Sequence, residues 1–506
     1  QVKKLFLLLL IMFAMIGACT IKHPNLPEWD ITLNVPLINE KYYMRDLVDS
    51  VNIIADTTDV VYLRSEGEVS TPNFGDVSFS LDFSSESIPL LAGQTYHGYV
   101  DVQDPDSDNE LVYGVLSVGV LQSRFNRLDS STSVSITFPD IRMENGSPFV
   151  FSPPANSGWE EYSLEGFRIG ALNSGIILSQ LQYFITISSS QPNGTPVGDL
   201  ELNLSQRLQF SVFEGKLPGH RIDMNESTTT VDVEYPFGLE NAIQLLEADL
   251  YLRLYNRIGF ELEFHGEFYA VNNHTGQHRT IPILDANGDH FIISPAIGDQ
   301  PSITNIEFSN NVNVLISIMP EHIELRNSYF IVRSGAASSI GMVKEADFID
   351  GFFTIDAPFR FILLAERIIV RNEADIEISG SNQNRIRDNL MSAEMDIDMI
   401  NNFPFGATVE LFFGNSPTID VDDPTTWNFK KSLHFHSNQM NDGMQSFVLQ
   451  LTKEELETFT RPHAYLRWAF TFDESITPIT ITASPMDYIH IKSMIRSDIH
   501  VQGGSK

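Results

Sequence analysis

Apolar and polar positions alternate with a period of two along most of the chain. Ile31, Leu33 and Val35 alternate with polar neighbours, and the same rhythm recurs as far as the C-terminal region. Because successive side chains of a β-strand point to opposite faces of a sheet, this alternation predicts half-buried strands. The 35 phenylalanines suit such pleated surfaces. We therefore expect a mainly β protein of several antiparallel β-sandwich, Ig-like domains with few short helices.

Helical patterns are few and short. The clearest covers Thr452 to Phe459, where Thr452 can cap the first turn and Glu455, three residues later, completes a capping box. Weaker helical patterns run from Tyr43 to Val51, from Glu240 to Ala248 and from Asn384 to Met391.

One internal repeat is visible. ADLYLRLYNRIGFELEF (residues 248–264) aligns without a gap on AEMDIDMINNFPFGATV (residues 393–409), an offset of 145 residues. In each copy an asparagine breaks the alternation four residues before a phenylalanine. These pairs are Asn256 with Phe260 and Asn401 with Phe405. Because asparagine favours turns, each copy predicts a strand, a turn and a second strand, and the two copies indicate a duplicated domain.

The repeat's succession of apolar, asparagine and aromatic positions is similar to the Ig-like sandwich of late-embryogenesis desiccation proteins. This resemblance covers seventeen residues per copy and implies a sandwich fold alone. The expected organisation is a signal peptide (1–18), a tether (19–29), an N-terminal β region (30–205), two sandwich repeats (206–350 and 351–498) and a tail (499–506).

A twelve-residue apolar run, Leu5 to Ile16, follows Lys3 and Lys4. As a helix it would rise about 18 Å, too little for the roughly 30 Å hydrocarbon core of a membrane. A basic start, a short apolar middle and small residues after it predict a secretory signal.

The segment Ile16-Gly17-Ala18-Cys19 resembles the lipobox of bacterial lipoproteins. The resemblance implies that Cys19, the single cysteine of the chain, carries lipid and becomes the first residue of the mature protein. Thr20 stands where, in enteric bacteria, an aspartate would retain the protein at the inner membrane. We therefore expect an outer-membrane protein held by its lipid anchor, facing either the periplasm or the cell surface.

Composition narrows the classes of function. The 506 residues include 66 acidic and 32 basic side chains, a formal net charge of −34. Such a field repels phosphate backbones, which excludes nucleic acid as a partner. No G-x-S-x-G, S-x-x-K, H-E-x-x-H or P-loop pattern is present, and we expect a non-catalytic protein. Glycoside hydrolysis stays open, because it needs only two carboxylates at the right separation.

Acidic residues crowd into DVQDPDSDNE, where oxygen ligands at alternate positions suit calcium. The candidate ligands are Asp104, Asp106, Asp108 and Glu110. Asn109 occupies the glycine position of an EF-hand loop and Val115 its final glutamate position, so the segment is no EF-hand. The alternative is a solvated acidic turn, and we expect no other cofactor. LDANGDH (residues 284–290) is a weaker candidate of the same kind.

Two further residue types, tryptophan and histidine, suggest binding. Trp159 and Trp427 lie in proline-containing loops, where they could form platforms for sugars or cover the edge of a core. His434 and His436 alternate along an expected strand and could share a metal ion, or be two exposed histidines. The hypotheses are therefore a non-catalytic envelope protein with a protein partner, a glycan-binding or glycan-degrading surface protein, and a lipid carrier whose sheets enclose an apolar groove.

Overall fold

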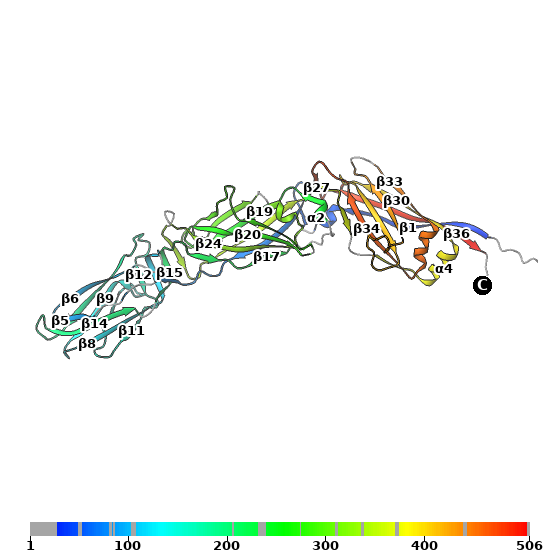
Figure 1. Ribbon diagram of the computed structural model, residues 1–506. Helices are drawn as coiled ribbons and strands as arrows, with labels where there is room; N and C mark the ends of the chain where they lie inside the picture. Colours follow the sequence, from blue (N-terminus) through cyan, green and yellow to red (C-terminus); the bar gives the residue numbers. More distant parts are fainter. Residues whose placement is uncertain are drawn as a thin grey trace, which may run out of the picture.

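The computed structural model describes residues 28–48, 53–79, 83, 87–102, 108–204, 207–230, 239–273, 275–308, 312–334, 339–369, 374–438 and 443–502. Within these ranges the strand ladders are antiparallel and build three sandwiches in a row, which confirms the predicted mainly β fold (Figure 1). The chain has an accessible surface of 27947 Å². A compact monomer of the same mass would expose only about 18,600 Å². The molecule is therefore an elongated rod.

We call the sandwich that contains both ends of the described chain the proximal sandwich. The sandwich at the other end of the rod is the distal sandwich, and the middle sandwich lies between them (Figure 1). The first sheet of the proximal sandwich has the order β1-β36-β30-β33, and its second joins β28 and β29 to β34-β31-β32. The first sheet comprises β1 (Glu28–Tyr43), β36 (Tyr488–Gln502), β30 (Leu390–Asn401) and β33 (Gln445–Leu451). The second comprises β28 (Arg367–Ile369), β29 (Ala374–Glu377), β34 (His463–Phe472), β31 (Ala407–Gly414) and β32 (Phe429–Phe435).

The middle sandwich has the same arrangement. Its first sheet has the order β3-β26-β19-β23, and in its second sheet β16 and β17 pair with β24, which continues to β20 and β21. The first sheet comprises β3 (Val61–Ser70), β26 (Ile349–Pro358), β19 (Asp249–Asn256) and β23 (Ser302–Phe308), with β2 (Ile53–Ala55) beside β3. The second comprises β16 (Arg221–Asp223), β17 (Ser227–Thr230), β24 (His322–Val332), β20 (Leu262–Asn272), β21 (Gln277–Pro282) and β22 (Phe291–Ile293).

The distal sandwich repeats this neighbour order as β4-β15-β7-β12 and β5-β14-β8-β11. Its strands are β4 (Val77–Phe79), β15 (Leu208–Lys216), β7 (Glu110–Val118), β12 (Arg168–Gly170), β5 (Ile88–Leu91), β14 (Pro196–Leu204), β8 (Val120–Arg127) and β11 (Glu160–Ser163). Its first sheet continues through β9 (Ser133–Arg142), which also pairs with β10 (Pro148–Phe151), and through β13 (Gln180–Ser188) and β6 (Thr95–Asp101). Gly119 alone separates β7 from β8, so no turn of the Asn256 type is found there.

The three sandwiches are nested along the chain. The distal sandwich is inserted between β3 and β16 of the middle one, and the middle sandwich is inserted at the corresponding connection of the proximal one, between β1 and β28. As a result β1 pairs with β36, and β3 pairs with β26 nearly 300 residues away. These pairings cross the contiguous boundaries expected at residues 205 and 350. Alternation identifies a strand and its buried face, but it does not identify the strand's partner.

The repeated asparagines occupy equivalent turns that carry the chain from one sheet of a sandwich to the other. Asn256 is fully buried; its Oδ1 accepts from the Ile258 amide at 2.9 Å and its Nδ2 donates to the Ser294 carbonyl at 2.8 Å. Asn401 accepts in the same way from the Phe403 amide at 3.0 Å. The predicted strand, turn and strand are confirmed in both copies.

Replacing Asn256 by alanine is expected to destabilise the middle sandwich by about 2 to 4 kcal/mol, because a buried amide and a buried carbonyl both lose their partner. Asn305→Ala, at an exposed position of β23, is the control and should change the free energy of unfolding little. Chemical denaturation measures both variants. Equal effects of the two substitutions would show that the turn bonds are unimportant.

Main-chain hydrogen bonds tie the sandwiches together. Between distal and middle sandwiches, β25 (Gly341–Lys344) pairs with β15, and the Phe74 amide donates to the Asp347 carbonyl at 2.7 Å. Between middle and proximal sandwiches, β18 (Ile243–Leu245), β27 (Arg360–Leu363) and β35 (Ile479–Thr480) form a small sheet. The Val61 amide also donates to the Ile481 carbonyl at 3.2 Å. Because both junctions are backbone-paired, we expect the rod to be stiff.

His220 lies at the junction of the distal and middle sandwiches, where its ring stacks on Phe74 at 4.8 Å. Although His220 is exposed overall, its surroundings at the junction desolvate the imidazole, which lowers the pKa of His220 below its ordinary value. As the pH falls, the imidazole is therefore protonated at a higher pH in the unfolded chain than in the folded protein. The free energy of unfolding consequently decreases as the pH falls below about 6.5. We expect His220→Phe to reduce the acid-dependent loss in melting temperature, whereas His278→Phe on β21 should not. A wild-type pH profile in His220→Phe would contradict this.

Helices are few, as predicted. The helix α5 (Lys453–Leu456) begins with the expected capping box of Thr452 and Glu455, and η3 (Glu457–Thr460) follows it. Two of the weaker patterns are shorter in the structure, where they correspond to η1 (Met44–Leu47) and α2 (Leu239–Ala242). The third corresponds to α4 (Gly380–Asn389), which begins earlier than the pattern and is longer, and α3 (Val312–Ile316) is additional. Among the described residues, none of the helices has the length and apolar character needed to span a membrane.

Candidate functional site

An apolar cavity of about 540 Å³ lies where the middle and proximal sandwiches meet. Asp46 is the one acidic or basic side chain among its lining residues. The lining comprises Tyr42, Tyr43, Met44, Asp46, Ile53, Leu63, Leu239, Ile243, Leu245, Met319, Phe359, Phe361, Leu363, Phe403, Phe405, Phe470, Phe472 and Ile481. Cavities of this size and character bind small apolar molecules.

The repeated turn positions one wall of this cavity. Asn401 accepts from the Phe403 amide and donates to the Phe405 carbonyl at 2.8 Å, which fixes both residues at the sheet crossing. The Phe403 and Phe405 rings stack at 5.4 Å, and Phe472 of β34 packs edge-on against Phe405 at 5.4 Å. The aromatic wall is therefore held by a buried hydrogen-bonded turn.

The opposite wall comes from the junction itself. Phe361 and Leu363 belong to β27, which pairs with β18, and both side chains are almost fully buried. At the mouth, the Tyr42 hydroxyl donates to Glu40 at 3.0 Å, and this hydrogen bond raises the pKa of the Tyr42 phenol. No pair of acid and base groups converges on the described lining. The described lining therefore suits binding of an apolar group.

The candidate calcium ligands are only partly placed. Asp104 and Asp106 lie outside the described residues, as does Cys19, the predicted site of lipid attachment. Asp108 is exposed, and the Glu110 carboxylate is engaged by the Lys216 ammonium at 2.7 Å. In the weaker segment, Asp285 accepts main-chain hydrogen bonds that shape a turn, and these bonds lower its pKa. The described residues hold no cluster of three or more metal-ligating side chains.

Trp427 packs inward instead of standing out as a platform. It lies edge-on against Phe412 at 5.5 Å and joins a second small core under its loop. The buried members of this core are Phe412, Ile419, Val421 and Ala469. Trp159 is 42% exposed, with the Arg124 guanidinium 5.1 Å from its ring centre. Of the two candidates, Trp159 alone presents an open face.

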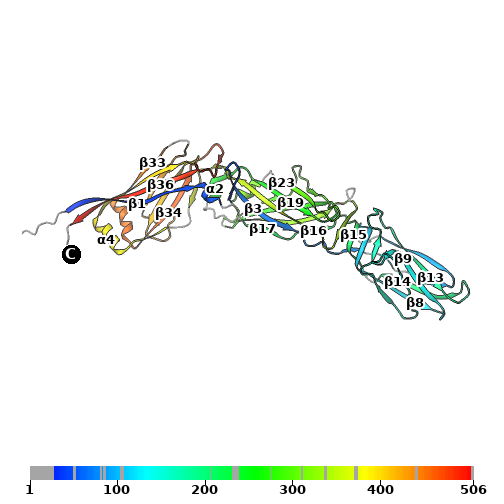
Figure 2. The same ribbon diagram turned by 180° about the vertical axis from the view of Figure 1, so that it is seen from behind.

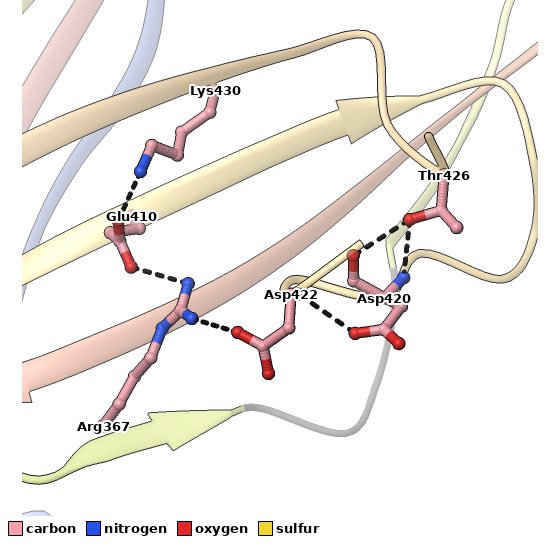
Figure 3. Close-up of polar contacts among 6 residues, drawn as sticks. All are labelled: Arg367, Glu410, Asp420, Asp422, Thr426 and Lys430. Carbon is pink, nitrogen blue, oxygen red and sulfur yellow. Dashed lines mark hydrogen bonds and ion pairs between the residues drawn. The ribbon is translucent and has the colours of Figure 1, made fainter. Parts of the chain in front are cut away.

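A network of charges holds the loop that carries Trp427 (Figure 3). The Arg367 guanidinium bonds Glu410 at 2.7 Å and Asp422 at 2.6 Å, while Lys430 reaches Glu410 at 2.8 Å. The Asp422 amide in turn donates to the Asp420 carboxylate at 3.0 Å. Burial would raise the pKa of Glu410, but the Lys430 hydrogen bond and the Arg367 charge together lower it. The Glu410 and Asp422 carboxylates are thus paired with cations of the chain itself, and the Asp420 carboxylate with a main-chain amide, which marks the network as structural.

The two histidines predicted to share a face do so. His434 and His436 have ring centres 4.5 Å apart, and His434 Nε2 lies 3.0 Å from the Asp473 carboxylate. The described part of the chain offers them no further ligand for a metal.

Comparison with known proteins assigns no family to the chain. No protein-family model and no curated protein matches it. It is similar to a secreted protein of Parabacteroides distasonis, with 10% identity and a TM-score of 0.32 over 94% of this chain and 100% of that chain. A structure of Broad Bean Stain Virus has 10% identity and a TM-score of 0.16, covering 52% of this chain and 79% of that chain. The VP2 subviral particle of infectious bursal disease virus has 9% identity and a TM-score of 0.15, covering 96% of this chain and 84% of that chain. At these scores none of the likenesses carries an inference about function.

Proposed function

We propose that the protein is a non-catalytic lipoprotein of the cell envelope that projects its distal sandwich from the membrane as a stiff rod. The observation that carries the proposal is the pairing of β1 with β36. It brings both ends of the described chain to one tip of the rod, opposite the distal sandwich (Figures 1 and 2).

The dimensions support this role. Strands such as β24 contain 11 residues. At about 3.3 Å per residue, three sandwiches in a row extend about 100 Å. The nine residues from Cys19 to Pro27 add at most about 30 Å. A lipid on Cys19 would thus hold the proximal sandwich near the membrane, while the distal sandwich reaches much farther out.

The anchor is tested by replacing its acceptor. Cys19→Ala is expected to abolish lipid attachment and either release the protein from membranes or block removal of the leader. Detergent phase partition and intact mass measure the change, and Ser157→Ala in the distal sandwich is the control. Normal processing with continued membrane association in Cys19→Ala would refute lipid anchoring.

The junction cavity supports a second candidate function, the binding of an aliphatic chain. In this version of the lipid-carrier hypothesis, the chain occupies the cavity between the middle and proximal sandwiches. A saturated chain of fourteen to sixteen carbons needs a pocket of a few hundred Å³, within the range of known ligand sites. The single carboxylate of Asp46 at the cavity disfavours an anionic head group beside it.

A filled cavity provides the test. Ile243→Trp should reduce binding of a fluorescent long-chain alcohol at least several-fold, whereas Ile292→Trp, at a position 40% exposed on β22, should leave it unchanged. Mass spectrometry of lipids extracted from the purified protein gives the natural occupant. Undiminished binding by Ile243→Trp would rule out the cavity.

A further inference from the structure

Apolar residues near the start of the first long strand of the middle and proximal sandwiches differ in burial. Val61 of β3 is fully buried and its amide donates to the Ile481 carbonyl at the junction with the proximal sandwich. At the start of β1, Trp29 and Ile31 are 46% and 38% exposed. Neither belongs to a buried hydrophobic cluster of the described residues. The proximal sandwich thus repeats an apolar contact surface without a sandwich against it.

This surface lies on a two-stranded ribbon at the tip of the rod. The pairing of β30 with β36 ends at Leu390 opposite Ile499, whereas β1 continues beside β36 to Trp29 opposite Val501. Figure 1 shows the ends of β1 and β36 projecting together from the proximal sandwich. The last residue pairs of the ribbon, from Asp30 with His500 to Glu28 with Gln502, therefore extend beyond the end of β30.

The ribbon is amphipathic. Its alternate positions form a polar face, on which His500 lies 2.9 Å from Asp30 and the Thr32 hydroxyl donates to Asp498 at 2.8 Å. That hydrogen bond lowers the pKa of Asp498 and keeps it ionised. Because neighbouring strand positions point to opposite faces, these carboxylates are directed away from Trp29.

We propose that Trp29 and Ile31 contact the lipid–water interface of the membrane in which the acyl chains of Cys19 sit. This inference rests on the lipid anchoring proposed above. At most about 30 Å of chain joins Cys19 to the ribbon, so the tip stays within reach of the membrane surface. Tryptophan favours that interface because one end of the indole is apolar and the other donates a hydrogen bond. The membrane takes the place that a neighbouring sandwich has at Val61.

Tryptophan fluorescence of the lipidated full-length protein tests the contact. The emission of Trp29 is taken as the difference between wild type and Trp29→Phe in vesicles of zwitterionic lipid, and that of Trp159 as the difference between wild type and Trp159→Phe. Trp159 is a matched control because it is 42% exposed but belongs to the distal sandwich. Trp29 emission should shift to shorter wavelength in vesicles and be largely quenched by lipids brominated near the head group. Trp159 emission should do neither.

The outcomes separate the two proposals. Flotation with the vesicles first establishes anchoring; a protein that does not float overturns the lipid anchor and the contact together. A floating protein whose Trp29 keeps its solvent-exposed emission overturns the contact alone. A blue shift without bromine quenching also overturns it, because a second copy or another protein would then cover the ribbon.

Discussion

A fragment of residues 76–217 is expected to fold by itself, whereas a fragment of residues 206–350 is expected to remain unfolded. The first contains every strand of the distal sandwich except β25, which belongs to the connection between β24 and β26. The second lacks β3 and nearly all of β26, so its first sheet would retain only β19 and β23. Two strands cannot cover the apolar face of the opposing sheet.

Circular dichroism and thermal unfolding distinguish these fragments. A third fragment, residues 53–70 joined to 218–358 by a short flexible linker, is the matched control and should fold cooperatively. The join has to span no more than the length of chain from residue 218 to Asn225, because the Asn225 amide donates to the Ser70 carbonyl at 2.9 Å. A cooperative transition in the 206–350 fragment, or its absence in the 76–217 fragment, would contradict the nested arrangement.

Phe353→Ala is expected to cost the middle sandwich about 3 to 5 kcal/mol. The Phe353 side chain is fully buried on β26, packs edge-on against Phe268 of the opposing sheet at 5.2 Å and lies directly over Gly67 of β3. It thus joins three segments that are far apart in the sequence. Truncation to alanine removes this contact and leaves a cavity between the sheets.

The neighbouring Phe352 is the control. It lies on the outer face of the same strand, is 41% exposed, and its replacement by alanine should change stability by less than about 1 kcal/mol. In Phe353→Ala, calorimetry should show an early transition for the middle sandwich and an unshifted transition for the distal one. Similar effects of the two substitutions, or a loss of the distal transition, would contradict the described packing.

Much of the local structure could be predicted from the sequence. Alternation located the strands, Asn256 and Asn401 located two sheet-crossing turns, and Thr452 with Glu455 located a capped helix. Each of these signals lies within a few residues. The third sandwich gave no such signal, because Gly119 stands alone where the other two have an asparagine turn.

The nesting and the cavity could not be predicted in the same way. Strand partners such as Glu28 and Gln502 are separated by almost the whole chain. The pattern of apolar and polar residues within one strand does not specify which strand it pairs with. Phe361, Phe405 and Phe472 appear in the sequence as ordinary apolar strand or turn positions, yet they meet in one cavity. Trp427 lies in a loop, as predicted, but the sequence left open whether it stands out or covers a core, because its contact with Phe412 depends on a core formed by separate strands.

The height of each end of the rod above the membrane tests the central proposal most directly. Because Cys19 is the single cysteine and would carry lipid, one new cysteine can be labelled at Gln94, in the turn between β5 and β6, or at Ser381 on α4. With acceptor dye in the bilayer, the label at residue 381 should show strong energy transfer and the label at residue 94 almost none. Equal transfer from both positions would show that the rod lies flat or is anchored elsewhere.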